Sequence, residues 1–280
     1  MRKIITIGDK YELFDGSNKV IIDSFGAKVL AFIEEDENRL FYNSNDISHS
    51  GIPLCFPNFG PLVNSKLVVD SEEYPMNQHG FIRDMDFELV EQSDTVLELK
   101  LKSTYETKTK YPFDFEFGVK FELQGNKLSI NFQWKNLSNN KAPISPGVHP
   151  YFRVYDKKNI ILQTRAINYN LSKDFSEVEE VIKSDYLDMF SENSFVIKGA
   201  PDINLINHNS EITKVDIGSK KFVEIIYNNK DFNRLTVWRK APDTDYICIE
   251  PANAQNKINE APYLIPHGDY WESEVSIVFN

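Results

Sequence analysis

Cysteine is scarce in this chain of 280 residues, in which only Cys55 and Cys248 occur. Two cysteines so far apart give neither a disulfide framework nor a pair at metal-binding spacing. Basic residues are too few to balance the acidic ones, with 31 lysines and arginines against 42 aspartates and glutamates. The net charge of -11 would repel nucleic acid and anionic membrane surfaces, so neither is expected as a partner.

Long hydrophobic runs are also lacking, and no stretch approaches the length needed to span a membrane. The apolar residues near the N-terminus are interrupted by Thr6, Gly8 and Asp9, which is too early for a signal peptide. We therefore expect a soluble protein of the cytoplasm. The sequence shows no linker, low-complexity tract or fixed-period repeat, which favours one domain over residues 1–280.

Aromatic residues are abundant, with 20 phenylalanines and 13 tyrosines in a chain that is 41% hydrophobic. This content is enough for a sizeable core. Aromatic side chains favour strands and also form platforms on which ring-shaped ligands stack.

Apolar and polar residues alternate over residues 97–102, 115–123 and 128–135, which is typical of antiparallel strands with one face on a core. Residues 124–127 read as a hairpin turn between the last two runs. Further strands are expected at 19–23, 27–33, 159–164, 222–227, 234–238, 246–250 and 274–279. The one helical signal spans residues 176–189, with Ser176 as its N-cap. The pattern predicts an all-β fold, a large antiparallel β-sandwich of two sheets with few short helices.

His149 is one of three ionisable residues that lie beside residues fixing the backbone. Pro150 holds it in an extended conformation, and Gly147 permits an unusual backbone angle nearby. A stiffened backbone suits a positioned general acid. The alternative is a histidine at a strand end that only bonds a neighbouring carbonyl.

His79 lies in a loop marked by Pro75 and Gly80, and loops often carry function. Arg83 follows four residues later and could hold a hydroxyl, phosphate or carboxylate in a fork of hydrogen bonds. The alternative is a solvated loop histidine, with Arg83 paired to Asp84 or Asp86.

Glu250 ends an alternating strand and precedes Pro251. Alternation places Ile247 and Ile249 on one face, with Tyr246, Cys248 and Glu250 on the other. Partial burial would raise the pKa of Glu250 toward the range of a useful base. The alternative is an exposed glutamate at a strand end.

Residues 51–61 are rich in glycine, proline and phenylalanine, which excludes regular structure over most of the segment. Such a segment could wall a pocket or plug the space between sheets. The remaining histidines, His49, His208 and His267, lie in polar loop contexts and are expected to play no part.

Four segments in this order resemble the aldose 1-epimerase (galactose mutarotase-like) family. They are residues 51–60, the His-Gly-Phe-x-Arg element at 79–83, the His-Pro-Tyr-Phe element at 149–152 and the Cys-Ile-Glu-Pro element at 248–251. The Pro-His-Gly-Asp turn at 266–269 also fits. The resemblance implies a galactose mutarotase-like sandwich with a sugar site in a cleft, and an enzyme of carbohydrate metabolism, an isomerase that interconverts the anomers of an aldose.

By the matching motifs, Glu250 would be the general base and His149 the general acid, while His79 would orient the ring-oxygen side of the sugar. Sugar-binding residues in the same elements would be Arg83, Phe81, Tyr151 and Asn58. The family's site usually includes an aspartate as well, for which Asp185, Asp188 and Asp202 remain open. Ring opening and reclosure need no redox or group transfer, so neither cofactor nor metal is expected, and the partner is a small aldose.

The sequence departs from the family's phosphosugar branch at His49 and Ser50, where that branch usually carries an arginine. This departure favours an unphosphorylated hexose, although Arg83, Lys66 or Arg153 could substitute. The alternatives are a hexose-6-phosphate 1-epimerase and a non-catalytic carbohydrate-binding sandwich. A metal site of two histidines and one carboxylate and a glycosidase are weaker alternatives. The sequence gives no oligomeric state.

Overall fold

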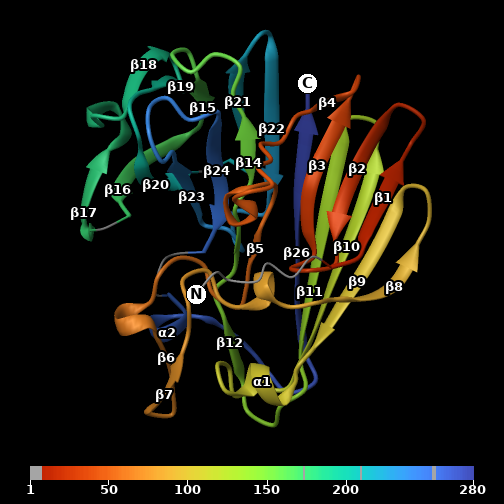
Figure 1. Cartoon of the computed structure of the whole chain (residues 1–280). Helices are drawn as coiled ribbons and strands as arrows, with labels where there is room; N and C mark the ends of the chain where they lie inside the picture. Colours follow the sequence, from red (N-terminus) through yellow and green to blue (C-terminus); the bar gives the residue numbers. More distant parts are fainter. Residues whose placement is uncertain (1–7, 173, 209, 254–256) are drawn as a thin grey trace.

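Two large antiparallel sheets carry the architecture of the chain (Figure 1). The computed structural model describes residues 8–172, 174–208, 210–253 and 257–280. The ten-stranded sheet runs, edge to edge, through β18 (Leu187–Ser191), β19 (Ser194–Ile197), β15 (Ile161–Gln163), β21 (Ile212–Gly218), β22 (Lys221–Tyr227), β26 (Tyr270–Phe279), β11 (Lys127–Asn136), β10 (Phe115–Gln124), β9 (Val96–Lys102) and β8 (Glu88–Gln92).

The second large sheet has eight strands and lies on the left in Figure 1. Its order is β17 (Asp174–Glu180), β16 (Ala166–Leu171), β20 (Asp202–His208), β23 (Arg234–Trp238), β24 (Tyr246–Ala252), β13 (Gly147–Val148) and β5 (Leu54–Cys55), with β14 (Tyr151–Arg153) paired to β24. Because β24 has partners on both sides, the strand that carries Glu250 is central to this sheet.

Smaller elements complete the fold. A four-stranded sheet consists of β1 (Lys10–Phe14), β2 (Asn18–Asp23), β3 (Lys28–Glu34) and β4 (Glu37–Asn38). Two ribbons pair β6 (Lys66–Val69) with β7 (Glu72–Pro75) and β12 (Ala142–Ile144) with β25 (Tyr263–Ile265). The helices are α1 (Tyr105–Lys108) and α2 (Lys257–Glu260), with 3-10 turns η1 (Ile47–His49), η2 (Val63–Ser65), η3 (Ile82–Asp84) and η4 (Val181–Lys183). Within the described ranges no helix is long and apolar enough to cross a membrane.

The β10–β11 hairpin confirms the alternation seen in the sequence. Along β10 every second side chain is buried, and Phe117 and Val119 face Trp134 and Phe132 across the pair. The turn at Gly125 has a positive φ of 57°, which glycine adopts without strain. The expected all-β sandwich with few short helices is therefore confirmed.

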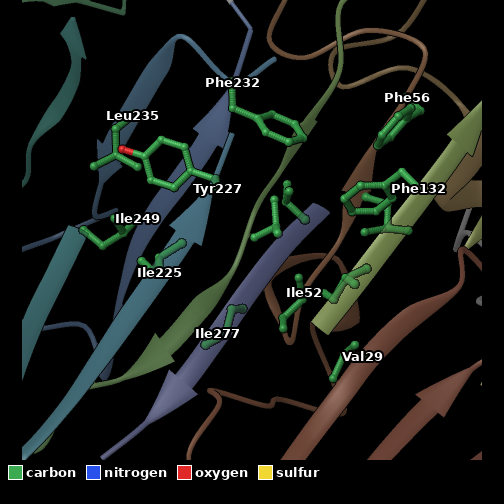
Figure 2. Packing of buried hydrophobic residues seen from close by; sticks show 14 of the residues in the cluster. Val29, Ile52, Phe56, Phe132, Ile225, Tyr227, Phe232, Leu235, Ile249 and Ile277 are labelled. Carbon is green, nitrogen blue, oxygen red and sulfur yellow. The ribbon is translucent and has the colours of Figure 1, made fainter. Parts of the chain in front are cut away.

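The two large sheets share one apolar core, seen in close-up in Figure 2. Ile225 and Ile277 from the ten-stranded sheet and Leu235 and Ile249 from the eight-stranded sheet are all fully buried in it. Burying one such side chain contributes roughly 1.5–3 kcal/mol. The single domain over residues 1–280 stays a prediction, which the continuity of this core supports.

The predicted helix over residues 176–189 is wrong. The segment forms the edge strand β17, the turn η4 and the edge strand β18. Each edge strand pairs with a neighbour, β17 with β16 and β18 with β19. The edges of β16 and β19 offer backbone N–H and C=O groups with which this segment can pair as strands. This tertiary pairing overrides a weak local preference for helix.

Candidate active site

A cleft of about 470 Å³ opens beside the C-terminal half of β24. His79, His149 and Glu250 all line it, although they lie on three segments far apart in the sequence. Arg83 and Tyr151 line it too, as the sequence predicted. The fold therefore brings together the three segments that carry the ionisable residues.

Glu250 projects from β24 into this cleft. Thr236 of β23 lies directly opposite Glu250 in the strand pair. Ile247 and Ile249 lie in the core, as alternation predicted. Glu250 is 1% exposed, so the alternative of an exposed strand-end glutamate is wrong.

His149 lies between β13 and β14, and its backbone N–H donates to the carbonyl of Pro53 at 3.0 Å. Its ring stacks on that of Tyr151, with centroids 4.7 Å apart and planes inclined by 9°. Gly147 allows the segment to come close to its neighbours, because a Cβ there would lie 2.3 Å from Cδ2 of Phe59. The backbone hydrogen bond, the close packing at Gly147 and the ring of Tyr151 together fix the position of the imidazole.

The imidazole Nε2 of His149 lies 3.4 Å from Oε2 of Glu250. Burial lowers the pKa of His149 to about 3 and raises the pKa of Glu250 well above its usual range. Burial therefore disfavours the charged form of each group. When the two facing atoms share one proton, a neutral pair has it on Glu250 and an ion pair has it on His149.

His79 lies 5.3 Å from His149 between ring centroids, and it is held by an unusual backbone. Its φ is +66°, and a Cβ on the following Gly80 would lie 1.9 Å from the carbonyl oxygen of Phe56. Nδ1 of His79 accepts a hydrogen bond from the N–H of Gly60 at 3.2 Å, so the neutral ring carries its proton on Nε2. Burial lowers the pKa of His79 well below its usual range. At 9% exposure it is not the solvated loop histidine of the alternative interpretation.

Arg83 lies in η3 and is partly exposed at the cleft. Its Nη2 donates to the carbonyl of Gln78 at 3.1 Å. The alternative pairing of Arg83 with Asp84 or Asp86 does not occur among the ion pairs of the described residues.

Phe81 and Asn58, which the sequence suggested as sugar-binding residues, are not among the residues that line the cleft. Phe81 is 2% exposed, and its ring packs against Tyr111 and Phe115 in the core. Asn58 is fully buried, and its Nδ2 donates to the carbonyl of Gly60 at 2.8 Å. A motif shows which residues are adjacent in sequence, whereas successive residues of an extended backbone point in opposite directions.

The segment 51–61 fulfils both interpretations that the sequence left open. Phe59, with Pro53, Gly60 and Pro61, walls the cleft. Phe56 points the other way and packs between Phe117 and Phe132 in the core, where Figure 2 shows it beside Phe132.

Of the three candidate aspartates, only Asp202 lines the cleft. It begins β20, next to β23 in the sheet. Asp188 pairs with Lys198 at 2.7 Å, and Asp185 is exposed outside the cleft.

Two ring side chains of the site, those of His49 and Trp238, were not predicted from the sequence. His49 was expected to play no part, but it lines the cleft, with its Nδ1 2.8 Å from Asp46. Trp238 lines the cleft as well, and its ring centroid is 6.2 Å from those of His49 and Tyr151. Nothing near His49 in the sequence signals this. Trp238 could have been found, because alternation along β23 places it on the same face as Thr236.

The described residues contain one group that could hold a metal ion, namely His149, Cys248 and Glu250, with ligand atoms within 4.8 Å of one another. His79 is not in this group, so the proposed triad of two histidines and a carboxylate does not form among the described residues. Cys248 is fully buried, and burial raises the pKa of its thiol well above the usual range. Since a thiol must lose its proton to bind metal, these donors fit a metal poorly.

Comparison with known proteins gives the same family that the sequence motifs suggested. The family model described as aldose 1-epimerase matches residues 9–262. The chain is 25% identical to Protein LacX (plasmid) of Lactococcus lactis subsp. lactis over 71% of its length and 72% of the relative's. It is 22% identical to a protein of Escherichia coli K12 named "Putative glucose-6-phosphate 1-epimerase", over 82% and 78% of the two chains. The crystal structure of a galactose mutarotase related enzyme from Lactobacillus acidophilus superposes with a TM-score of 0.81, at 24% identity and 97% coverage of both chains.

Proposed function

The chain belongs to the aldose 1-epimerase family, and on this premise we propose that it interconverts the α and β anomers of an unphosphorylated hexose. The observation that carries the proposal is the buried pair of Glu250 and His149, 3.4 Å apart at the wall of the cleft. A donor and an acceptor at this separation can serve two oxygens attached to the same carbon.

In the proposed reaction Glu250 takes the proton of the anomeric hydroxyl, O1, and His149 gives a proton to the ring oxygen, O5. The C1–O5 bond breaks, C1=O forms, and the sugar becomes an open-chain aldehyde. Rotation about C1–C2 turns the other carbonyl face toward O5. The O5 hydroxyl then attacks C1, His149 recovers its proton and Glu250 returns one to O1. Atoms and protons balance without a cofactor, and each positioned acid or base contributes roughly 10²–10⁴-fold.

The remaining lining residues supply binding in this proposal. His79 orients the ring-oxygen side of the sugar, and Asp202 accepts hydrogen bonds from its hydroxyl groups. Phe59, Tyr151 and Trp238 offer rings to the apolar C–H face of a pyranose.

The charges at the cleft favour an uncharged sugar. Glu250 and Asp202 are acidic, and Arg83 is the one lysine or arginine among the lining residues that the structure describes. Two cations that the sequence offered as substitutes are engaged elsewhere, because Lys66 lies 3.5 Å from Glu73 and Arg153 lies 3.7 Å from Glu37. A phosphate dianion usually needs a denser set of donors than one partly exposed guanidinium.

A hexose-6-phosphate is the second candidate, favoured by Arg83 at the cleft and by the name of the Escherichia coli relative. Polarimetry on freshly dissolved α-glucose, α-galactose and glucose 6-phosphate, with the uncatalysed rate subtracted, separates the candidates. We expect acceleration of a neutral hexose. Acceleration of the phosphorylated sugar alone would select the second candidate, and binding without acceleration would indicate a carbohydrate-binding protein.

A further inference from the structure

A buried arginine lies behind the acid–base pair. Arg234 begins β23 and is 3% exposed. Its Nε and Nη2 atoms are buried without a hydrogen-bond partner among the described residues. A guanidinium is costly to bury unless a nearby negative charge compensates it, so its location calls for a physical reason.

The register of the sheet places this guanidinium near Glu250. Arg234 pairs with Ala252 across the strands, and Thr236 pairs with Glu250. Glu250 is therefore the diagonal neighbour of Arg234 on the same face, where Cβ atoms are about 7–8 Å apart and within reach of long side chains. The Cζ atom of Arg234 lies 5.1 Å from the ring centroid of Phe59, which walls the cleft. The positive charge thus lies behind the Phe59 wall of the cleft, on the face of the sheet that carries Glu250.

Three ionisable groups interact electrostatically with Arg234. Glu250 and Asp202 attract its positive charge, and Arg234 disfavours the protonated form of His79. Burial lowers the pKa of Arg234 to about 9, so the guanidinium keeps its charge at neutral pH. Burial alone would favour a protonated Glu250, and the attraction of Arg234 opposes that effect.

We propose that Arg234 is a positioning residue for the acid–base pair: its buried positive charge stabilises the carboxylate form of Glu250 and so favours the arrangement with the shared proton on His149. The two ways of placing one proton on the pair have the same overall charge. A positive charge on the Glu250 side of the pair stabilises the arrangement with a negative Glu250. Without that cation, the burial that favours the neutral arrangement is opposed less, so Glu250 holds the proton over a wider pH range and is a weaker participant as base.

Arg39 provides a matched control, because it is also a buried arginine, at 1% exposure. Its terminal nitrogens bond Glu34 and the carbonyl of Asn280 at the C-terminal end of the chain, away from the lining of the cleft. Replacing it removes a buried guanidinium without removing one beside Glu250.

The deciding experiment is difference infrared spectroscopy of the carboxyl group, which needs no catalytic turnover. Each protein is compared with its Glu250→Gln counterpart over a range of pH, so that only the Glu250 band remains. We expect the carboxylate of Glu250 to form at the same pH in the wild type and in Arg39→Met, and only at a higher pH in Arg234→Met. The same titration midpoint in the wild type and in Arg234→Met would overturn the proposal. Should Arg234→Met not fold, Arg234→Gln is the second neutral variant.

A kinetic readout rests in addition on the proposed anomer interconversion. Removing the charge of Arg234 should move both limbs of the pH–rate profile to higher pH, with kcat/KM at about pH 6 reduced tenfold or more. Arg234→Lys keeps a charge in the acidic range and should keep the acidic limb of the wild type. A uniform decrease at all pH values would show a merely structural role. If the wild type accelerates no sugar, the proposed function fails, while the infrared result still decides the role of Arg234.

Discussion

The β10–β11 hairpin and the cleft beside β24 both contain buried side chains, but those of the hairpin are apolar and those of the cleft include ionisable groups. The hairpin packs Phe115, Phe117 and Trp134 into an apolar layer, with Phe115 and Trp134 stacked at 4.4 Å. The cleft instead buries Glu250 and His149, whose charged forms burial disfavours. The difference indicates that the hairpin contributes stability and that the cleft maintains reactive groups at a cost in stability.

Replacing the base should produce the largest effect and should separate the two regions. Glu250→Gln keeps the shape of the side chain and removes its basicity, so the enzymatic mutarotation rate should fall by roughly 10²–10⁴-fold. The melting temperature should stay the same or rise, since a buried ionisable group is removed. Polarimetry and thermal unfolding measure the two quantities. A large fall in stability would break the contrast, because Glu250 would then be a structural residue.

Replacing a hairpin ring should show the converse pattern. Trp134→Ala is expected to reduce the free energy of unfolding by about 3–5 kcal/mol, because it leaves a cavity in a close-packed layer. The folded fraction should keep a kcat near that of the wild type. Denaturant titration measures the stability.

Trp238→Ala is the matched control for this change, since Trp238 is a partly exposed tryptophan at the cleft. Trp238→Ala should reduce the free energy of unfolding by less than Trp134→Ala does, and it should raise KM. Equal losses of stability in the two variants would contradict the assignment of the two regions.

Asp202 tests the binding side of the cleft with a smaller expected effect. Asp202→Asn removes a charged acceptor for sugar hydroxyls, and one charged hydrogen bond contributes about 1.5–3 kcal/mol. We expect KM to rise by roughly one to two orders of magnitude with a smaller change in kcat. Asp188→Asn, outside the cleft and paired with Lys198, is the control and should leave KM unchanged.

The smallest effect concerns pH and stability. Burial lowers the pKa of His79 and of His208, so the unfolded chain takes up protons at a higher pH than the folded protein does. As pH falls below about 6.5, the unfolded state therefore binds more protons and the free energy of unfolding decreases. Denaturant titrations at several pH values measure this slope. His208→Gln should flatten it, and an unchanged slope would show that His208 titrates alike in both states.

The sequence predicted the hairpin almost residue by residue, because alternation over ten residues has one structural solution. The strand of Glu250 was predicted for the same reason, and the motifs around His79 and His149 placed them in one site. The positions of the remaining site residues and of residues 176–189 depend on contacts between segments that are far apart in the sequence. Trp238 and Asp202 reach the cleft through the pairing of β20, β23 and β24, and His49 reaches it from a loop without a local signal. Residues 176–189 became edge strands only because β16 and β19 offer open backbone groups.

The most direct test of the account is a double-mutant cycle on mutarotation with Glu250→Gln, His149→Gln and the double variant. If the two residues act as one acid–base pair, the double variant should be no more than about threefold slower than the slower single variant, since residues that act as a unit are strongly non-additive. If the two losses multiply, or if either single variant keeps the wild-type rate, Glu250 and His149 do not form the catalytic pair.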